Sequence, residues 1–202
     1  MFSAKTYAAR RNMLRTKIGS GIVLFPGNPL SPNNYPNNAY YFRQDSSFLY
    51  YFGLNIPSLA GLIDADTGEE ALYGDDFTVE DIIWTGPQPT LRELGAKVGI
   101  AATHPLSELE KRLRKAISLG RKIHFLPPYR GETKLWLSSL LGIKPTLLHD
   151  YKSVDLMFAV AEMREKKSAE EVEEMERAFQ IGYKMHTLAM NCLLYTSDAA
   201  DD

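Results

Sequence analysis

Residues 60–73 carry the pattern of a tight antiparallel β-hairpin. Two short apolar runs, Ala60-Gly61-Leu62-Ile63-Asp64 and Glu70-Ala71-Leu72-Tyr73, flank the turn formers Asp66-Thr67-Gly68. Asp and Gly favour turns because an Asp side chain can accept a hydrogen bond from a nearby backbone amide and Gly tolerates a positive φ. The pattern therefore predicts a sheet with at least one antiparallel pair of strands.

Three further segments have the composition of short strands. Ile22-Val23-Leu24-Phe25 is a continuous apolar run, too short for a helix and closed by Pro26-Gly27, which is typical of a buried strand. Ile123-His124-Phe125-Leu126 is stopped by two prolines, and Val98-Gly99-Ile100 is the third candidate. Residues 28–38 are dense in Pro, Asn and Ser, which predicts a loop.

Helical patterns alternate with these strands. Leu106–Leu119 has apolar residues three and four apart, with Ser107 as a candidate cap and Gly120 after its end. Helices are also predicted at Lys5–Lys17, Phe77–Ile83 and Thr133–Leu141. This alternation predicts an α/β fold, a mixed β-sheet flanked by helices.

Residues 40–53 are rich in aromatic side chains. Asp45 or Ser46 can cap a two-turn helix here, and Gly53 can end it in the left-handed conformation. We expect Asp45 to be a cap rather than a catalyst, and the aromatic side chains around it to belong to the core rather than to a ligand cage.

The composition shifts toward helix formers after Val154. Asp155–Glu165 forms one segment, and Ser168-Ala169-Glu170-Glu171 is a capping box that opens a long helix. We interpret residues 1–150 as one domain, 151–167 as a linker region and 168–191 as the start of a second domain. The long helix carries an apolar stripe (Val172, Met175, Phe179, Tyr183) that we expect to be exposed and to cause weak self-association.

Residues 192–202 match one reading frame of a common transposase sequencing adapter, residue for residue. We interpret this segment as translated adapter, so that the natural sequence ends at about Asn191 and the second domain is truncated. A natural acidic tail is the alternative.

Charge and cysteine content exclude several classes of function. The chain has 23 Lys and Arg and 25 Asp and Glu, of which three acidic residues belong to the adapter-like segment. This balance argues against nucleic acid or an anionic membrane as the main partner. Cys192, in the same segment, is the one cysteine, so the remainder offers no disulfide framework and no thiolate ligand. Without a signal peptide pattern or a run of ~20 apolar residues, we expect a soluble, cytoplasmic protein.

Few residues have the spacing of a catalytic or metal site. Asp64 and Asp66 are expected to set the hairpin turn, and Asp75 and Asp76 to cap the next helix, rather than to bind metal. The four histidines (His104, His124, His149 and His186) lie far apart, so each is expected to be solvated or satisfied in the core, although His186 could lie near a cleft of a complete enzyme. The glutamates at 170, 171, 173, 174 and 176 suit the first turns of a helix, where negative charge complements the helix dipole.

Four elements together resemble one family. They are the Arg-Gln-Asp-Ser-Ser-Phe run within Tyr41–Gly53, the hairpin with Leu62-Ile63-Asp64 and Gly68, Trp84-Thr85-Gly86, and the junction Arg164-x-x-Lys167-Ser168-x-x-Glu171-Val172. In this order they resemble the N-terminal half of Xaa-Pro aminopeptidases (aminopeptidase P). One departure is a Glu-Lys pair in the junction where the family often has an aliphatic pair.

The resemblance implies a two-domain metallopeptidase that hydrolyses the bond between an N-terminal residue and a following proline. It implies a creatinase-like N-terminal domain, followed by a pita-bread catalytic domain that binds two divalent metal ions, usually manganese, through two Asp, one His and two Glu. All five ligands would lie beyond this chain, so no catalytic or metal-binding residue is assigned within it, and the chain itself would be an inactive accessory and oligomerisation domain.

The resemblance also implies a homo-oligomer in which Trp84 contacts the substrate of a neighbouring subunit, with ordinary core packing as the alternative role for this side chain. Two other functions stay open. One is an Xaa-Pro dipeptidase or creatinase, which share the domain pair. The other is a non-catalytic peptide- or protein-binding module, since some histone chaperones keep the fold without metals.

Overall fold

The structure, a computed structural model, describes residues 2–35 and 38–197. The chain divides into two compact units, residues 1–163 and residues 164–202. The first unit holds the sheet and the helices that cover it, and the second holds one long helix. Within the described residues, no helix combines the length and apolar character needed to cross a membrane.

A five-stranded mixed sheet forms the centre of the first unit. Its strands are β1 (Ile22–Pro26), β2 (Ala60–Asp64), β3 (Glu70–Tyr73), β4 (Ala102–His104) and β5 (Ile123–His124), in the order β4-β3-β2-β1-β5. β2 pairs antiparallel with β1 and β3, whereas β5 runs parallel to β1 and β4 parallel to β3. The predicted hairpin and the predicted mixed sheet are confirmed.

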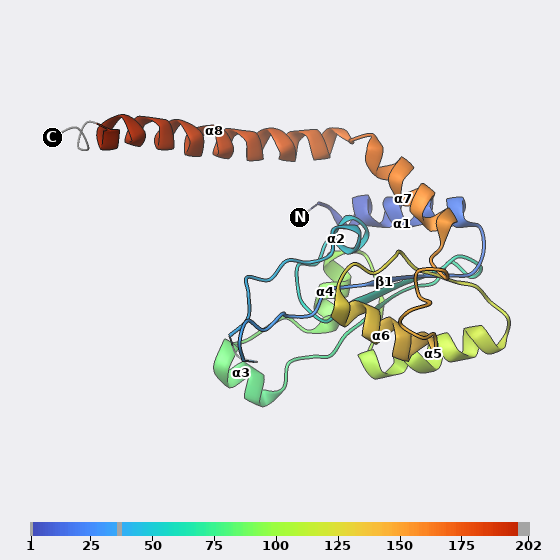
Figure 1. The fold of residues 1–202 in the computed structure, drawn as a ribbon. Helices are drawn as coiled ribbons and strands as arrows, with labels where there is room; N and C mark the ends of the chain where they lie inside the picture. Colours follow the sequence, from blue (N-terminus) through green and yellow to red (C-terminus); the bar gives the residue numbers. More distant parts are fainter. Residues whose placement is uncertain (1, 36–37, 198–202) are drawn as a thin grey trace. The chain divides into compact units, whose positions relative to one another are not determined.

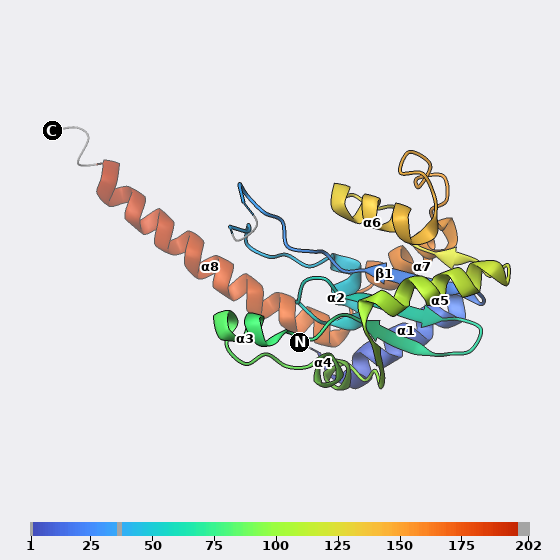
Figure 2. The same cartoon turned by 90° about the horizontal axis from the view of Figure 1, so that it is seen from below.

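Helices cover both faces of this sheet. The helices of the first unit are α1 (Ala4–Ile18), α2 (Ser46–Phe52), α3 (Val79–Thr85), α4 (Leu91–Lys97), α5 (Leu106–Ser118), α6 (Gly131–Leu141) and α7 (Val154–Glu165). α1, α2 and α7 lie on one face, and α5 and α6 lie side by side on the other (Figures 1 and 2). The fold is therefore a three-layer α/β arrangement.

Alternate residues of each central strand enter two separate cores. In β1, Val23 and Phe25 join the cluster beneath α1, α2, α4 and α7, whereas Ile22 and Leu24 join the cluster beneath α5 and α6. A strand buried on both faces needs apolar residues at successive positions. This explains the continuous apolar run in the sequence.

The aromatic helix has the predicted caps. The Asp45 carboxylate accepts hydrogen bonds from the backbone amides of Ser47 and Phe48, at 2.9 and 2.8 Å. Gly53 ends α2 with a left-handed φ of 66°. The α2 side chains Phe48, Tyr51 and Phe52 are buried, as expected, but Tyr40 and Tyr41 before the helix are exposed.

The prediction of a strand at residues 98–100 is wrong. Val98 instead ends α4, and Gly99 turns the chain with a φ of 76°. The edge strand lies just beyond, at β4. Val98 and Ile100 are buried in the core, so their apolar character reflects burial and not strand pairing.

Helix capping between residues 75 and 107 also differs from the prediction. Thr78, not Asp75 or Asp76, caps α3. The Asp76 carboxylate accepts from the Leu91 amide at the start of α4, and Asp75 accepts from the Leu106 amide at the start of α5. Ser107 does not cap α5. These carboxylates accept from the first amides of helices that begin 15 and 31 residues along the chain, a distance that local patterns do not reveal. In α4 the contact adds to the capping box of Thr90.

We expect Asp76→Ala to destabilise the first unit by about 1 kcal/mol, the usual cost of losing a helix cap. The Asp76–Leu91 amide contact is 2.6 Å long and partly buried, so water replaces it poorly. Thermal unfolding followed by circular dichroism measures the loss. Glu80→Ala, on the exposed helix α3, is the matched control. Equal melting temperatures for the two variants would contradict the capping role.

α7 belongs to the first unit, although residues 151–167 were predicted as a linker region. Leu156, Ala159, Val160 and Met163 of this helix are buried in the core beneath α1 and α2. The Tyr50 hydroxyl also donates to the Met163 carbonyl at 3.0 Å. The boundary between the compact units accordingly falls after Met163.

The second unit contains the long helix α8 (Ala169–Ser197). Its predicted capping box is present: the Ser168 amide donates to the Glu171 carboxylate at 2.8 Å, and the Glu171 amide donates to the Ser168 hydroxyl at 3.3 Å. The stripe Val172, Met175, Phe179 and Tyr183 is exposed, as predicted. Of the adapter-like segment, residues 198–202 lie outside the described residues.

α1 places an arginine inside the first core. The Arg11 side chain is fully buried and donates to the Glu70 carboxylate at 2.7 Å and to the backbone carbonyls of Tyr51 and Val98, each at 3.0 Å. Burial lowers the pKa of this guanidinium, although Glu70 opposes the shift. One side chain thus joins α1 to β3, to α2 and to the end of α4.

Candidate functional site

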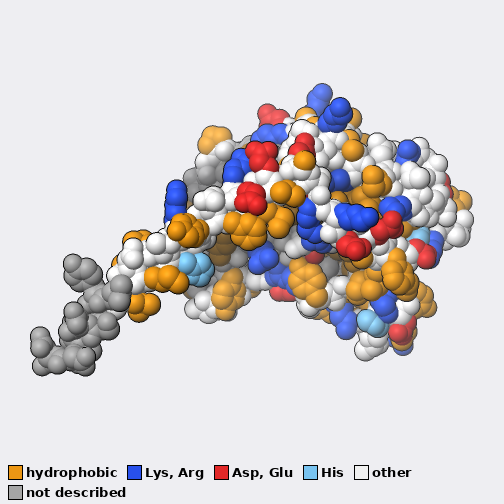
Figure 3. Space-filling model, turned by 90° about the horizontal axis from the view of Figure 1, so that it is seen from above, with side chains coloured by type: hydrophobic (Ala, Val, Ile, Leu, Met, Phe, Trp, Pro, Cys, Tyr) orange, Lys and Arg blue, Asp and Glu red, His pale blue; other side chains and the backbone are white. Residues whose placement is uncertain are grey.

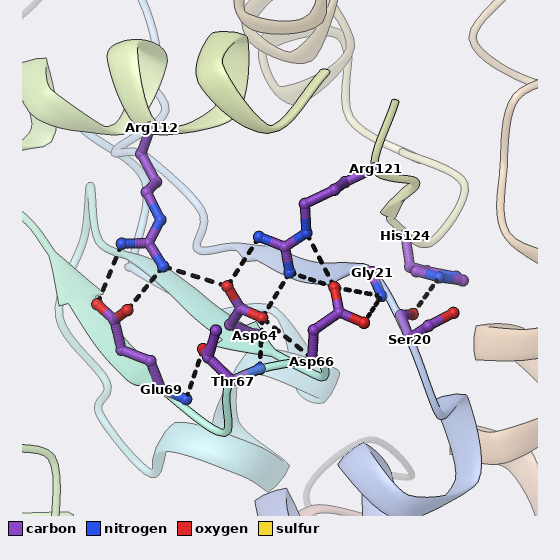
Figure 4. A network of polar contacts seen from close by, with 9 residues as sticks. All are labelled: Ser20, Gly21, Asp64, Asp66, Thr67, Glu69, Arg112, Arg121 and His124. Atoms are coloured by element: carbon purple, nitrogen blue, oxygen red, sulfur yellow. Dashed lines mark hydrogen bonds and ion pairs between the residues drawn. The ribbon is translucent and has the colours of Figure 1, made fainter. Parts of the chain in front are cut away.

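The two hairpin carboxylates lie at one edge of the sheet, where β2 ends and β1 begins (Figure 4). Asp64 is buried, and its Oδ1 accepts from the backbone amides of Asp66 and Thr67, both at 3.1 Å. Asp66 accepts from the Gly21 amide, at 3.2 Å to each carboxylate oxygen. Asp64 and Asp66 therefore set the hairpin turn, as predicted, and Asp66 also fastens the turn to β1.

Two arginines from distant elements converge on these carboxylates (Figure 4). Arg121, just before β5, donates to Asp64 at 2.5 and 3.0 Å and to Asp66 at 2.9 Å. Arg112 of α5 bridges Asp64, at 3.2 Å, and Glu69, at 2.7 Å. Burial alone would raise the pKa of the Asp64 carboxylate, but the Arg121 hydrogen bonds and charge, with the backbone amides of Thr67 and Asp66, lower it to about 2. We call the two arginines and their three carboxylates the hairpin ion network.

The hairpin ion network has the properties of a structural site. Its carboxylates are already engaged by guanidinium groups and backbone amides, so none has a free oxygen pair for a cation. Across the described residues, no group of three or more His, Cys, Asp or Glu side chains could hold a metal ion. The residues present thus do not fit a metal centre.

His124 is the one buried histidine of the described chain. Its Nε2 lies 3.1 Å from the Ser20 carbonyl oxygen, which can only accept, so Nε2 carries the proton and Nδ1 accepts from the Ser153 hydroxyl at 2.6 Å. Burial, assisted by Lys122, lowers the pKa of His124 and so favours the neutral ring. The expectation of a core-satisfied imidazole is confirmed for this residue.

The Gln-Asp-Ser run also has a structural explanation. The buried Gln44 carbonyl oxygen accepts from the Asn28 amide at 2.6 Å and from the Asp45 amide at 2.9 Å, while its amide nitrogen donates to the Ile56 carbonyl at 2.7 Å. Gly27 lies against this side chain, because a Cβ there would come within 3.0 Å of Gln44 Nε2 and 2.6 Å of the Leu59 carbonyl oxygen. Gln44 therefore joins three loop segments.

Trp84 lies on α3, which buries none of its side chains. The Trp84 side chain is 83% exposed, and Val79 and Ile83 on the same helix are exposed as well. Core packing within this chain, the alternative role considered for Trp84, is therefore not observed. An exposed apolar helix of this kind is typical of a contact surface.

Hydrophobic side chains also lie along α8, with charged groups concentrated in its first half (Figure 3). The exposed apolar residues of the helix are Val172, Met175, Phe179, Ile181, Tyr183, Met185, Leu188, Met190 and Leu193. Arg177 is paired with Glu174 at 2.7 Å. His186 is exposed on this helix.

Sequence reasoning identified the two aspartates of the hairpin ion network but not their partners. Arg112 and Arg121 are 48 and 57 residues away from Asp64. Arg112 lies on the amphipathic helix α5, and Arg121 follows it. Arginine is common on the polar side of such a helix, so the sequence carries no local signal for the contact with Asp64. The buried position of Arg11 was missed for the same reason.

The fold places the chain in a known class of α/β domains. It superposes on E. coli aminopeptidase P in its low-pH form with a TM-score of 0.75 and 22% identity, over 93% of this chain and 44% of that one. Zinc-substituted E. coli aminopeptidase P in complex with product gives the same TM-score and identity, over 92% of this chain and 44% of that one. The chain therefore has the same fold as the matching part of these structures, a mixed α/β sheet covered by helices.

The sequence identifies the family within that class. The model of the aminopeptidase P N-terminal domain matches residues 7–126, and the chain belongs to this family. An uncharacterized peptidase of Saccharomyces cerevisiae is 26% identical over 94% of this chain and 33% of its own length. A probable Xaa-Pro aminopeptidase of Aspergillus flavus is 23% identical over 73% of this chain and 26% of its own length. The chain therefore spans a third or less of these relatives.

Proposed function

We propose that this chain is the N-terminal part of an Xaa-Pro aminopeptidase, a hydrolase that removes an N-terminal residue when the second residue is proline. The family match over residues 7–126 carries the proposal. It is supported by the resemblance of the chain to a probable Xaa-Pro aminopeptidase. Within such a protein the first unit would serve in oligomerisation and substrate access, and the chain by itself would be inactive. The parent would act on proline-containing peptides in the cytoplasm.

We place the proposed metal centre of the parent outside this chain. Aminopeptidase P from E. coli has been solved in a zinc-substituted form. The carboxylates of the hairpin ion network are engaged by arginines, so they do not supply ligands. We propose that the parent binds two divalent metal ions, manganese by preference, through residues that follow α8, since carboxylate and imidazole ligands suit this metal.

Recovery of the source DNA across the junction after Met190, by specific amplification, tests the proposal most directly. We expect an open reading frame with two Asp, one His and two Glu as ligands, and manganese-dependent release of the first residue from an Xaa-Pro peptide by its product. Activity on Xaa-Pro dipeptides alone would favour a dipeptidase, and activity on creatine would favour a creatinase. A frame without ligands would favour the non-catalytic binding module.

Trp84 is the residue of this chain that we propose for substrate contact, in trans, within a homo-oligomer. In the full-length protein, Trp84→Ala is expected to lower kcat/KM about tenfold, equivalent to about 1.4 kcal/mol of lost contact. Val79→Ala on the same helix, where Val79 is 77% exposed, is the matched control. Sedimentation velocity checks that both variants keep the oligomer. Unchanged kinetics for Trp84→Ala in an intact oligomer would contradict the role.

A further inference from the structure

A cavity of about 270 Å³ lies at the edge of the sheet opposite the hairpin ion network. Its apolar surface comes from Pro29 after β1, Leu59 before β2, Leu106 at the start of α5 and Trp136 in α6. Glu132 and Thr133, in the first turn of α6, add polar groups. The cavity is therefore mostly apolar with polar groups on one side.

The topology makes this edge a favourable place for a ligand. β4 and β5 run parallel to their neighbours β3 and β1, and each is followed by a helix, α5 or α6. Both helices consequently begin at the carboxyl-terminal edge of the sheet and then run side by side across one face (Figures 1 and 2). In open α/β sheets, ligands bind in the crevice outside the carboxyl ends of the strands.

One polar group in the cavity wall lacks a partner. Thr133 is 9% exposed, and its hydroxyl oxygen is itself buried and has no hydrogen-bond partner among the described residues. An unsatisfied buried hydroxyl is unfavourable, so most such groups in folded proteins are paired. Threonine in a helix occupies two χ1 rotamers, so a rotation about χ1 can turn the buried hydroxyl toward the cavity when a partner enters.

The charges around the cavity favour a neutral ligand. The Glu132 carboxylate accepts from the Ser31 hydroxyl at 3.3 Å and lies 3.6 Å from Arg130 Nε, so an anion would meet a carboxylate. The N-termini of α5 and α6 carry partial positive charge, which offsets that of the carboxylate. The groups around the cavity therefore favour neither sign of charge, and a ligand without net charge suits them.

We propose that this cavity binds a small neutral molecule with a single ring and one hydroxyl or carbonyl group. The ring would lie against Trp136 and Leu106, and the polar group would pair with the Thr133 hydroxyl. The size agrees, because an apolar cavity of about 150 Å³ accommodates benzene and this cavity is larger. This site is independent of the proposed peptidase activity.

The test compares 4-fluorophenol with fluorobenzene, which lacks the hydroxyl, by fluorine NMR titration of the 202-residue chain. We expect saturable binding of 4-fluorophenol, with shifts of the Gly27, Ser58 and Thr133 amide signals, because these residues line the cavity. Thr133→Val keeps the shape of the side chain and removes the hydroxyl. It should weaken 4-fluorophenol binding about three- to tenfold and leave fluorobenzene binding unchanged.

Thr133→Val should also keep the melting temperature of the native chain, because the hydroxyl makes no hydrogen bond to the described residues. Equal affinity of 4-fluorophenol for the native chain and the variant would overturn the pairing with Thr133. Absence of saturable binding, or shifts at amides away from the cavity, would overturn the site and leave water as the occupant.

Discussion

Arg11→Met is expected to destabilise the first unit by about 3–5 kcal/mol, the cost of breaking a buried ion pair by removing one partner. The substitution leaves the Glu70 carboxylate and the backbone carbonyls of Tyr51 and Val98 without their donor in a partly or fully buried site. A typical domain is stable by about 5–15 kcal/mol. The substitution should consequently remove a large fraction of the stability of the first unit.

Urea unfolding followed by circular dichroism measures this effect. Lys5→Met, at an exposed position on the same helix α1, is the matched control. Its midpoint of urea unfolding should be nearly that of the native chain. Arg11→Lys keeps the charge but cannot donate in three directions along a planar fork, so its stability should lie between the native and the Met variant. A Met variant as stable as the Lys5 control would refute the role of Arg11.

Asp64→Ala should cost about 3 kcal/mol, because the side chain is 1% exposed and its loss leaves Arg112 and Arg121 without their shared partner. The amides of Asp66 and Thr67 lose an acceptor as well. Asp66→Ala, at the more exposed end of the hairpin ion network, should cost only about 1 kcal/mol. Urea unfolding of the two variants gives both values, and a larger loss for Asp66 would contradict this order.

The same carboxylate predicts a pH dependence. The pKa of Asp64 is lowered from 3.8 to about 2 in the folded chain. A carboxylate with a depressed folded pKa stabilises fully above its unfolded pKa and loses that contribution as the pH falls through the folded pKa. Native stability should therefore decrease between pH 4 and pH 2 more steeply than that of Asp64→Ala. Parallel stability curves for the two proteins over this interval would contradict the assignment.

Local patterns in the sequence predicted the elements of the fold for physical reasons that act over a few residues. The turn at Asp66-Thr67-Gly68, the Asp45 cap of α2 and the Ser168 capping box each depend on a side chain that bonds to a backbone amide two or three residues away. Apolar spacing predicted α5, since Leu109, Leu113 and Ala116 face one core. Such interactions are encoded within a single segment, so the segment reveals them.

The errors occurred where an interaction crosses the chain. Asp75 and Asp76 accept from the first amides of helices that begin 31 and 15 residues later, and Val98 is apolar because it enters the core after α4 has ended. Residues 151–167 were predicted as a linker region with a helical segment at Asp155–Glu165, but the apolar face of α7 completes the core of the first unit. In each case the side chain suits two local structures equally, and its distant partner selects one.

Local periodicity and short motifs in order were enough to predict the mixed α/β sheet, most helix positions and the resemblance to the aminopeptidase P family. The pairing of charges and the exposure of surfaces followed instead from tertiary contacts. The structure shows that Arg11 is buried in the core and that Arg112 and Arg121 pair with Asp64. It also shows that Trp84 is exposed and that a cavity lies beside Thr133 at the start of α6. Burial and ion pairing depend on which distant segments meet, and that is fixed only when the sheet assembles and brings those segments together.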